Sequence, residues 1–536
     1  MTQTEENEPF LPSPAIEEER RSSTPHNEFE IEDEELQQQQ KPNLVIIYAT
    51  FLGVFLSAAD ETLVTATYGT ISSQFHSLAL GSLLLTGYDF GYCVGLPVYG
   101  MLSDIYGCKA PLIWAYGLFG IGSVICGVST SLSQLIVGRV VAGLGGAGTS
   151  SLVSVIIADI MPPSEVAVMR AWMMNISIAA RSFGAPIGSF LTETVGWRWS
   201  FIGQLPLLGF CILVAAFGLP SSLNERKADE KEDESILSKI DIAGIITFAA
   251  TVMSFLALVY QTGTDTNQGL FILSIGAFII SLIAFLLVEF FWAKKPLIPL
   301  NLIKGEFGGF CLVQVLLYSG RFALIPQLVP YFVRVENMSD VLASSFLVAS
   351  SVGIAAGAMM AGYIIRRTKN YKKLVIIGLL GSIASYLLIF LRWRHGSNIL
   401  EGLYAFPTGL TKGMIFSAQF ICMSASVSKP RLATCVTVYY LSSQLGTVIG
   451  TASGSAMMQG LFRGELRRRL GGFPDSLKMV HDVLNEARYA MSLPGGIQQI
   501  VRACYLYSFQ FIPLYSLLCT SIALPLIIFP KERRID

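Results

Sequence analysis

The sequence is poor in charged residues: Asp, Glu, Lys and Arg make up 14% of its 536 residues, whereas hydrophobic residues make up 52%. A soluble domain carries about 25% charged residues, so this scarcity excludes an ordinary soluble protein and indicates several membrane spans. The formal net charge is −1, and no basic arm or basic-aromatic patch is present. We therefore expect no nucleic-acid partner.

Histidine is also scarce, with His26, His76, His395 and His481 scattered along the chain. The nine cysteines form no CxxC pair and no metal-ligand spacing. The sequence has no phosphate-binding Gly-rich loop, and its polar segments are too short for an ATPase domain. These absences leave no candidate for a catalytic triad, a metal or a cofactor, and we expect no enzyme.

The first 43 residues are polar and acidic, and no cleavable signal peptide is recognisable. Such a segment cannot bury enough apolar surface to fold, so residues 1–43 are predicted to be a disordered cytosolic tail. Within it, Glu6, Phe10 and Leu11 resemble an acidic dileucine sorting signal, which would bind a sorting adaptor. Such signals direct proteins to the vacuole or lysosome.

Long apolar runs dominate the remainder of the sequence. A helix needs about 20 apolar residues to cross the hydrocarbon core of a bilayer. Fourteen runs of suitable length are present: 44–67, 80–102, 111–130, 132–158, 172–194, 201–219, 241–260, 270–292, 308–332, 341–365, 373–391, 399–426, 432–460 and 503–528.

The placement of Lys and Arg predicts the orientation of these spans. If the N-terminus is cytosolic, most basic residues of the short loops fall on the cytosolic side, and only Arg198, Arg334, Arg392 and Arg394 fall on the other. This asymmetry follows the positive-inside rule and predicts 14 spans with both termini in the cytosol. The predicted protein is thus an all-α polytopic membrane protein, either a secondary transporter or a channel.

Three motifs lie at the ends or inside these spans. The turn "GMLSDIYGCKA" contains Gly100, Asp104, Gly107 and Lys109. Here Gly100 is expected to let helices approach, Asp104 to cap or pair at the membrane edge, and Lys109 to anchor the next helix; an ordinary positive-inside turn is the alternative. The fourth span carries Arg139 before a Gly-rich run, "IVGRVVAGLGGAG", and the fifth carries Gly184, Pro186 and Gly188 in "SFGAPIGSF".

These motifs, with "ADETLV" in the first span and "WRWSF" before the sixth, resemble the 14-span drug:proton antiporter branch of the major facilitator superfamily, and within it the fungal vacuolar basic amino acid transporters. The resemblance covers about residues 41–530. It implies two six-helix halves, 44–219 and 307–536, with two extra helices in the linker 220–306 and a long non-cytosolic loop at 461–502. It also implies that the turn motif and the Gly-Pro run take part in conformational gating.

Asp60 and Arg139 are charges inside apolar helices, where a lone charge is costly and usually functional. Both are predicted to lie in the far third of the membrane, on spans that the resemblance places side by side. We therefore expect them to pair and to handle the coupled proton, with a static structural ion pair as the alternative. Glu61 follows Asp60 directly, so it is expected to point elsewhere.

Asp89 lies near the middle of the second span with Tyr88 and Tyr92 beside it. This group is a candidate for binding an amine, and the alternative is a structural pair between Asp89 and a buried cation. Arg181, Arg321 and Lys412 are candidates for that pair or for binding a carboxylate. A zwitterion such as an amino acid would use charges of both signs.

These observations predict a proton-coupled transporter that moves amino acids, basic ones in particular, from the cytosol into the vacuole. A drug or siderophore antiporter of the plasma membrane is the alternative, and a non-transporting nutrient sensor or scaffold is an alternative of another class. Asn337 stands in a glycosylation sequon, "NMS", on the non-cytosolic side.

Overall fold

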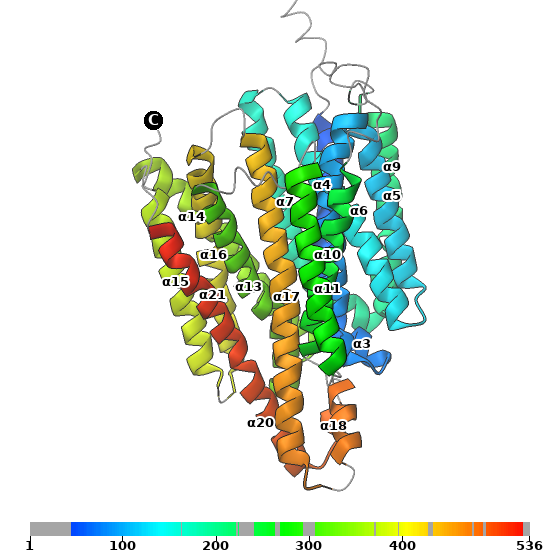
Figure 1. The fold of residues 1–536 in the computed structure, drawn as a ribbon, viewed down its shortest axis with the longest axis vertical. Coiled ribbons are helices and arrows are strands. Elements are labelled where there is room, and N and C mark those ends of the chain that lie inside the picture. Colours follow the sequence, from blue (N-terminus) through cyan, green and yellow to red (C-terminus); the bar gives the residue numbers. More distant parts are fainter. Residues whose placement is uncertain are drawn as a thin grey trace, which may run out of the picture. The chain divides into compact units, whose positions relative to one another are not determined.

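The computed structural model describes residues 44–161, 163–220, 223, 241–262, 268–292, 306–368, 371–394, 396–426, 432–473, 476–485 and 489–528. Residues 48–536 form one unit, which is built of long helices (Figure 1). Helices are the expected solution here, because a backbone in hydrocarbon must satisfy its hydrogen bonds within the segment. The predicted tail, including Glu6, Phe10 and Leu11, lies outside the described residues.

Each apolar run predicted from the sequence is helical over all or most of its described residues. The helices before and within the linker are α3 (Leu44–Gln74), α4 (Leu83–Tyr106), α5 (Lys109–Gly127), α6 (Leu132–Ile160), α7 (Pro163–Thr194), α8 (Trp197–Ile202), α9 (Leu205–Leu213) with η2 (Val214–Gly218), α10 (Ile242–Thr262) and α11 (Gln268–Leu287) with η5 (Val288–Trp292). A short helix η1 (Leu78–Leu80) precedes α4.

The helices after the linker are α13 (Glu306–Glu336), α14 (Asp340–Thr368), α15 (Tyr371–Arg392), η6 (Ile399–Tyr404), α16 (Ala405–Ser426), α17 (Leu432–Leu470), α18 (Ser476–Asn485), α19 (Tyr489–Ser492), α20 (Gly495–Phe509) and α21 (Phe511–Ile528). The all-helical prediction is confirmed for the described part of the chain, where the backbone has only one isolated bridge, Arg394 to Gly396.

Ten helical segments among the described residues are long and apolar enough to cross a membrane. Four predicted spans, α4, α7, α16 and α17, are not among these ten. Three of them carry candidate charges of the site: Asp89 on α4, Arg181 on α7 and Lys412 on α16. Charged side chains thus lie in three of the four predicted spans outside the ten, and the total of 14 spans stays a prediction.

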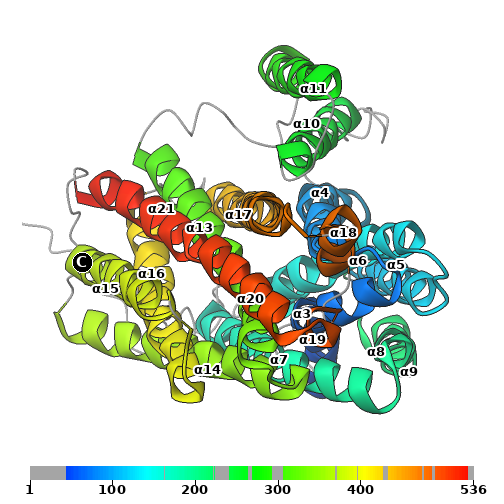
Figure 2. The same ribbon diagram turned by 90° about the horizontal axis from the view of Figure 1, so that it is seen from below.

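The helices pack in two groups that meet along two seams. Before the linker, α6 packs against both α4 and α5; after it, α16 packs against α14 and α15, and α17 against α13. The seams between the groups are α4 against α17 and α7 against α14. The pair α10 and α11 lies outside the bundle beside α4 and α17 (Figure 2). This arrangement places the charged residues of α3, α4 and α7 opposite those of α13 and α16.

We call the face where α3 begins the near face and the face where α3 ends the far face. At the far face α17 continues to Leu470, a helix of 39 residues, and Figure 1 shows α18 and α20 beside this extension. The predicted loop at 461–502 is thus largely helical where it is described. The helix α18 packs on α17 and also contacts η1 in the other group of helices.

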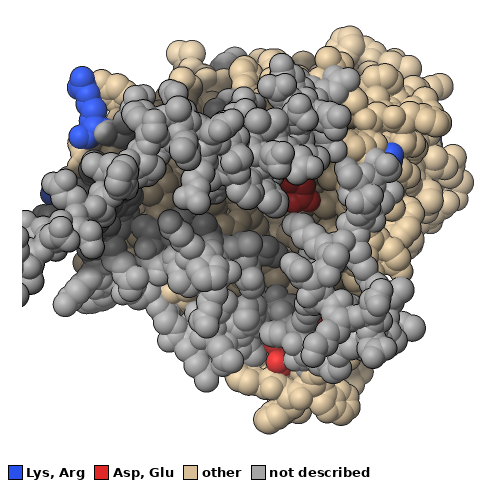
Figure 3. All heavy atoms as spheres, turned by 90° about the horizontal axis from the view of Figure 1, so that it is seen from above, with Lys and Arg blue, Asp and Glu red and all other residues tan. Residues whose placement is uncertain are grey.

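The near face is shown in Figure 3. Many of its atoms belong to residues that the structure does not describe, and a group of Asp or Glu atoms is visible in a recess among them. The basic loops on which the predicted orientation depends fall largely in those segments. The cytosolic location of both termini and the domain division therefore remain predictions.

Candidate functional site

Asp60 and Arg139 meet in the interior of the first group of helices. An Arg139 Nη1 donates to Asp60 Oδ2, and both side chains are only 1% exposed. Gln204 Nε2, from the turn before α9, donates to the other carboxylate oxygen at 3.0 Å. The expected pair is therefore formed. An ion pair so deeply buried needs such extra hydrogen bonds to offset its desolvation.

The arginine is also held by neighbours that carry no charge. Its Nε donates to the carbonyl of Leu84 at 3.3 Å, and its guanidinium lies 4.3 Å from the centroid of the Tyr88 ring. The Tyr88 hydroxyl in turn lies 3.0 Å from Ser57 Oγ. Tyr88 therefore belongs to the Arg139 network. It faces away from Asp89, because consecutive residues on a helix face different directions, and its predicted part in binding an amine stays a prediction.

Glu61 forms a second ion pair, with Arg181 on α7 at 2.6 Å. This pair is more open than the first, since the Arg181 side chain is 41% exposed and that of Glu61 is 17% exposed. Tyr92 lies close enough to Arg181 and Glu61 for both charges to interact with its hydroxyl group. Glu61 indeed points away from Asp60, but the partner of Arg181 is Glu61 and not the predicted Asp89.

Asp89 is 5% exposed and faces the seam between the two groups of helices. Thr451 on α17 donates to its carboxylate at 3.5 Å. Among the described residues it forms no ion pair, so the structural pair with Arg181, Arg321 or Lys412 is not present. A buried carboxylate with only a weak neutral partner is costly, and such a group is suited to receive a proton or a cationic ligand.

Two cations face this region from the second group of helices. Arg321 on α13 donates to Ser350 Oγ at 2.9 Å and to the carbonyl of Thr408 at 3.4 Å. The Lys412 ammonium has no hydrogen-bond partner in the described ranges and lies 3.4 Å from the ring centroid of Tyr318. Neither cation pairs with a carboxylate within the described part of the chain. They therefore remain available to an anionic group.

The turn between α4 and α5 shows what its residues do structurally. Gly107 caps α4 with a φ of 72°, a conformation that favours glycine. Lys109 Nζ donates to the carbonyl of Leu219 at 2.7 Å, so this lysine ties the start of α5 to the end of the sixth predicted span. The expected packing role of Gly100 is wrong, because a Cβ added there would meet no atom within 4 Å. Asp104 lies in α4, and a gating role for the motif stays a prediction.

The Gly-Pro run of α7 lies directly against α3. A Cβ on Gly184 would come within 2.4 Å of the carbonyl oxygen of Ala59, and one on Gly188 within 2.5 Å of Leu63. Pro186 lies between them inside the helix. These glycines permit the close approach of α7 to the turn of α3 that carries Asp60 and Glu61, so the motif positions both ion pairs.

Asn337 lies between α13 and α14 at the far face with a φ of 53°, a conformation that asparagine tolerates. Its sequon partner Ser339 accepts a hydrogen bond from the backbone N–H of Leu342 at 3.3 Å and so caps α14. Glycosylation of Asn337 stays a prediction. In the described ranges, no three His, Cys, Asp or Glu side chains gather in a way that could hold a metal ion.

Sequence reasoning missed two members of the site. Gln204 binds Asp60 directly, and its only signal was an amide inside an otherwise apolar run. Tyr318 contacts Lys412 and lies within electrostatic range of Arg181 and Arg321, yet it was only one of several polar residues in the later spans. A single sequence does not show which face of an apolar helix points inward, and the assignment of Gln204 and Tyr318 to the site requires that knowledge.

Three curated relatives cover most of the chain. The vacuolar membrane amino acid uptake transporter fnx2 of Schizosaccharomyces pombe is 29% identical over 480 residues, 87% of this chain and 81% of that protein. The multidrug resistance protein fnx1 of the same organism is 26% identical, over 87% and 88% of the two chains. The vacuolar basic amino acid transporter 1 of Saccharomyces cerevisiae is 25% identical, over 77% of each.

The fold is also found in solved structures. A bacterial homologue of the human lysosomal transporter Spinster, in an inward-facing and unoccupied conformation, superposes with a TM-score of 0.57. It is 17% identical, and the match covers 91% of this chain and 98% of that one. The family model described as the Major Facilitator Superfamily matches residues 50–451. The chain therefore belongs to the Major Facilitator Superfamily, as its sequence motifs predicted.

Proposed function

We propose that this transporter moves amino acids, basic ones in particular, from the cytosol into the vacuole in exchange for protons. The observation that carries the proposal is the placement of charges of both signs on helices from both groups. Asp89 and Glu61 lie on α4 and α3, while Arg321 and Lys412 lie on α13 and α16. A free amino acid carries an ammonium and a carboxylate, and this arrangement offers a counter-charge to each.

Tyr318 connects the two sides of this arrangement. Its ring covers the Lys412 ammonium, and Arg181 lies within electrostatic range of its hydroxyl. In the proposal, Lys412 and Arg321 bind the carboxylate of the substrate, and Asp89 with Tyr92 binds its ammonium. The second positive charge of lysine, arginine or histidine then competes with Arg181 for Glu61, in the more open of the two ion pairs.

The proton role is assigned to Asp60 with Arg139. A carboxylate held by an arginine keeps its negative charge, and it takes up a proton when the arginine moves away. Alternating access moves helices against one another around a central site. Because α3 carries both Asp60 and Glu61, a shift of α3 against α6 and α7 changes both ion pairs together. Proton and substrate binding are thereby coupled.

The relatives support the same substrate class and compartment. Two of the three curated relatives are described as vacuolar amino acid transporters, and one of these two as a basic amino acid transporter. Vacuolar targeting, an adaptor bound to the N-terminal tail and proton coupling are parts of the proposal.

Transport into sealed vesicles tests this function. The full chain is reconstituted, the lumen is acidified, and uptake of labelled lysine, arginine and histidine is followed. We expect uptake that depends on the proton gradient, and its loss in Asp60→Asn. The matched control is Asp482→Asn on α18, the same chemical change at a far-face carboxylate outside the proposed site. Equal loss in both variants would contradict the proton role, and no uptake by folded wild type would overturn the amino acid assignment.

A drug or siderophore antiporter of the plasma membrane is the second candidate, because one relative of nearly full coverage is described as a multidrug resistance protein. A cationic dye that is expelled in a gradient-dependent manner, together with absence of lysine uptake, would favour it. Fluorescent tagging at the C-terminus distinguishes the vacuolar membrane from the plasma membrane.

A further inference from the structure

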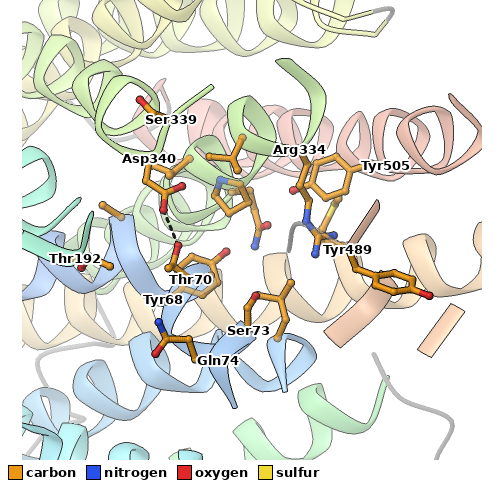
Figure 4. A pocket seen from close by; sticks show the side chains of 18 of the residues that line it. Tyr68, Thr70, Ser73, Gln74, Thr192, Arg334, Ser339, Asp340, Tyr489 and Tyr505 are labelled. Carbon is orange, nitrogen blue, oxygen red and sulfur yellow. Dashed lines mark hydrogen bonds between the residues drawn. The ribbon is translucent and has the colours of Figure 1, made fainter. Parts of the chain in front are cut away.

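A cavity of about 890 Å³ opens at the far face, between the ends of helices from both groups. Its walls come from α3, α7, α13, α14, α17, α19 and α20. Figure 4 shows Arg334 and Tyr505 on one side of the cavity and Asp340 and Thr70 on the other. This volume falls within the range of about 300–1,000 Å³ that is typical of small-molecule sites.

Arg334 is the distinctive residue of this cavity. Its guanidinium lies 5.4 Å from the ring centroid of Tyr505 and 5.6 Å from that of Phe462. Its Nη2 is buried and has no hydrogen-bond partner among the residues that the structure describes. A buried guanidinium nitrogen with an unused donor is costly, and an anionic ligand would remove that cost.

Neighbouring arginines at the far face are paired, which makes Arg334 different. Arg392 donates to Glu401, and Arg502 lies 3.4 Å from Glu336. Arg334 forms no ion pair within the described residues, although two carboxylates of the cavity lie on α14 and α7. Its charge is therefore left for a ligand rather than used to hold helices together.

The opposite wall carries negative charge. Asp340, in the first turn of α14, accepts a hydrogen bond from Thr70 Oγ1 at 2.6 Å, and Glu193 lines the same cavity. Gln459 on α17 adds a buried carbonyl oxygen, Oε1, for which the described part of the chain supplies no hydrogen-bond donor. The cavity thus has a positive charge at Arg334 on one wall and negative charges at Asp340 and Glu193 on the opposite wall.

We propose that this far-face cavity is a second binding site, distinct from the central one, for a small molecule that carries a carboxylate. The Arg334 guanidinium binds the carboxylate, and an ammonium on the same molecule is directed to Asp340. Thr70 follows Asp60 by ten residues on α3, so the site lies about 15 Å beyond the central pair along the helix. That the ligand is the transported amino acid after release rests on the proposed function.

A fluorescent probe placed in the cavity can report its occupancy alone. Ser73 lines the cavity near the end of α3, and Ser73→Cys labelled with bimane gives such a probe. The nine native cysteines are buried or partly buried, and the labelled wild-type chain supplies the background. The purified full chain in lipid nanodiscs is titrated with lysine, with 6-aminohexanoate, which lacks the α-amine, and with cadaverine, which lacks the carboxylate.

We expect lysine and 6-aminohexanoate to change the bimane signal and cadaverine to have no such effect. Arg334→Gln should weaken both responses by about tenfold or more, since a charge-assisted hydrogen bond is lost. The affinity of Arg334→Lys should lie between those of the wild type and Arg334→Gln, because lysine keeps the charge without the planar donor geometry. Arg502→Gln, a far-face arginine outside the cavity, is the matched control and should bind as wild type does.

Three results would overturn the proposal: a cadaverine response equal to that of lysine, unchanged affinity in Arg334→Gln, or no response to any carboxylate. The first and third require only the Ser73→Cys chain, so they decide the question even if the Arg334 variants do not fold. Acetate, added as a separate titrant, distinguishes a general carboxylate site from one for amino acids. Failure of lysine uptake with an intact bimane response would contradict the proposed function and leave this site standing.

Discussion

Removing one or both members of the Asp60–Arg139 pair gives the most direct test of the site. In Asp60→Asn the Arg139 charge keeps the Leu84 carbonyl at 3.3 Å and the Tyr88 ring at 4.3 Å. In Arg139→Gln the carboxylate keeps the neutral Gln204 donor at 3.0 Å. The unpaired Arg139 therefore keeps two stabilising contacts, whereas the unpaired Asp60 keeps one.

The magnitudes follow from this difference. Breaking a buried ion pair by removing one partner costs about 3–5 kcal/mol of the free energy of unfolding. We expect Asp60→Asn to lose about 3 kcal/mol of the free energy of unfolding, the lower figure. The remaining Arg139 charge is stabilised by a desolvated cation–π contact, which contributes about 2 kcal/mol. Arg139→Gln should lie near the upper figure. The double variant leaves two neutral amides and should cost less than either single change.

Reversible unfolding in mixed micelles with increasing SDS measures these free energies. The interaction term of the double-mutant cycle should be about 5 kcal/mol or more, because the single losses sum to about 8 kcal/mol and the double loss stays below about 3 kcal/mol. The exposed pair Arg502 and Glu336 is the control, and its cycle should give less than about 1 kcal/mol. A double variant whose loss equals the sum of the two single losses would refute the reasoning, because the two groups would then act independently.

Other predictions concern helix packing and pH. Gly184→Ala should destabilise the protein by about 1–3 kcal/mol, because the new methyl group meets the Ala59 carbonyl; Gly100→Ala, which meets no atom, should be neutral in the same unfolding assay. Hydrogen bonds from Arg468 lower the pKa of Glu465 on the far-face extension of α17. This carboxylate therefore stabilises the extension above its ordinary pKa, and the contribution is lost as the pH falls through the lowered value. Hydrogen exchange of residues 461–470 should increase at strongly acidic pH in the wild type, and Glu465→Gln should show that increase already at neutral pH.

Much of the fold followed from local patterns. Apolar runs of about 20 residues located the helices, because length and hydropathy alone decide whether a segment suits the bilayer. The pairing of Asp60 with Arg139 was also predictable, since two buried opposite charges at similar depth have few other ways to offset their desolvation.

The partners of the other charges were not predictable in the same way. Arg181 could have met Asp89 or Glu61, and the choice depends on how far α7 is rotated against α3. That rotation is fixed by the contacts of Gly184 and Gly188 with α3, which a sequence pattern does not show. The far-face cavity depends on where α19 and α20 place Tyr489 and Tyr505, and the hydropathy pattern of the sequence does not show that placement.

The length of α17 has a mechanical consequence. Its 39 residues form one continuous helix that contacts Asp89 through Thr451 and ends at Leu470 on the far side. The 19 residues between these two points span about 28 Å, so a tilt of roughly 10° about Thr451 displaces the far end by about 5 Å. Gln459, in the wall of the far-face cavity, lies on this same segment of α17. Any motion of α17 that moves Thr451 away from Asp89 therefore also moves Gln459 and changes the width of that cavity, because one continuous helix carries both residues.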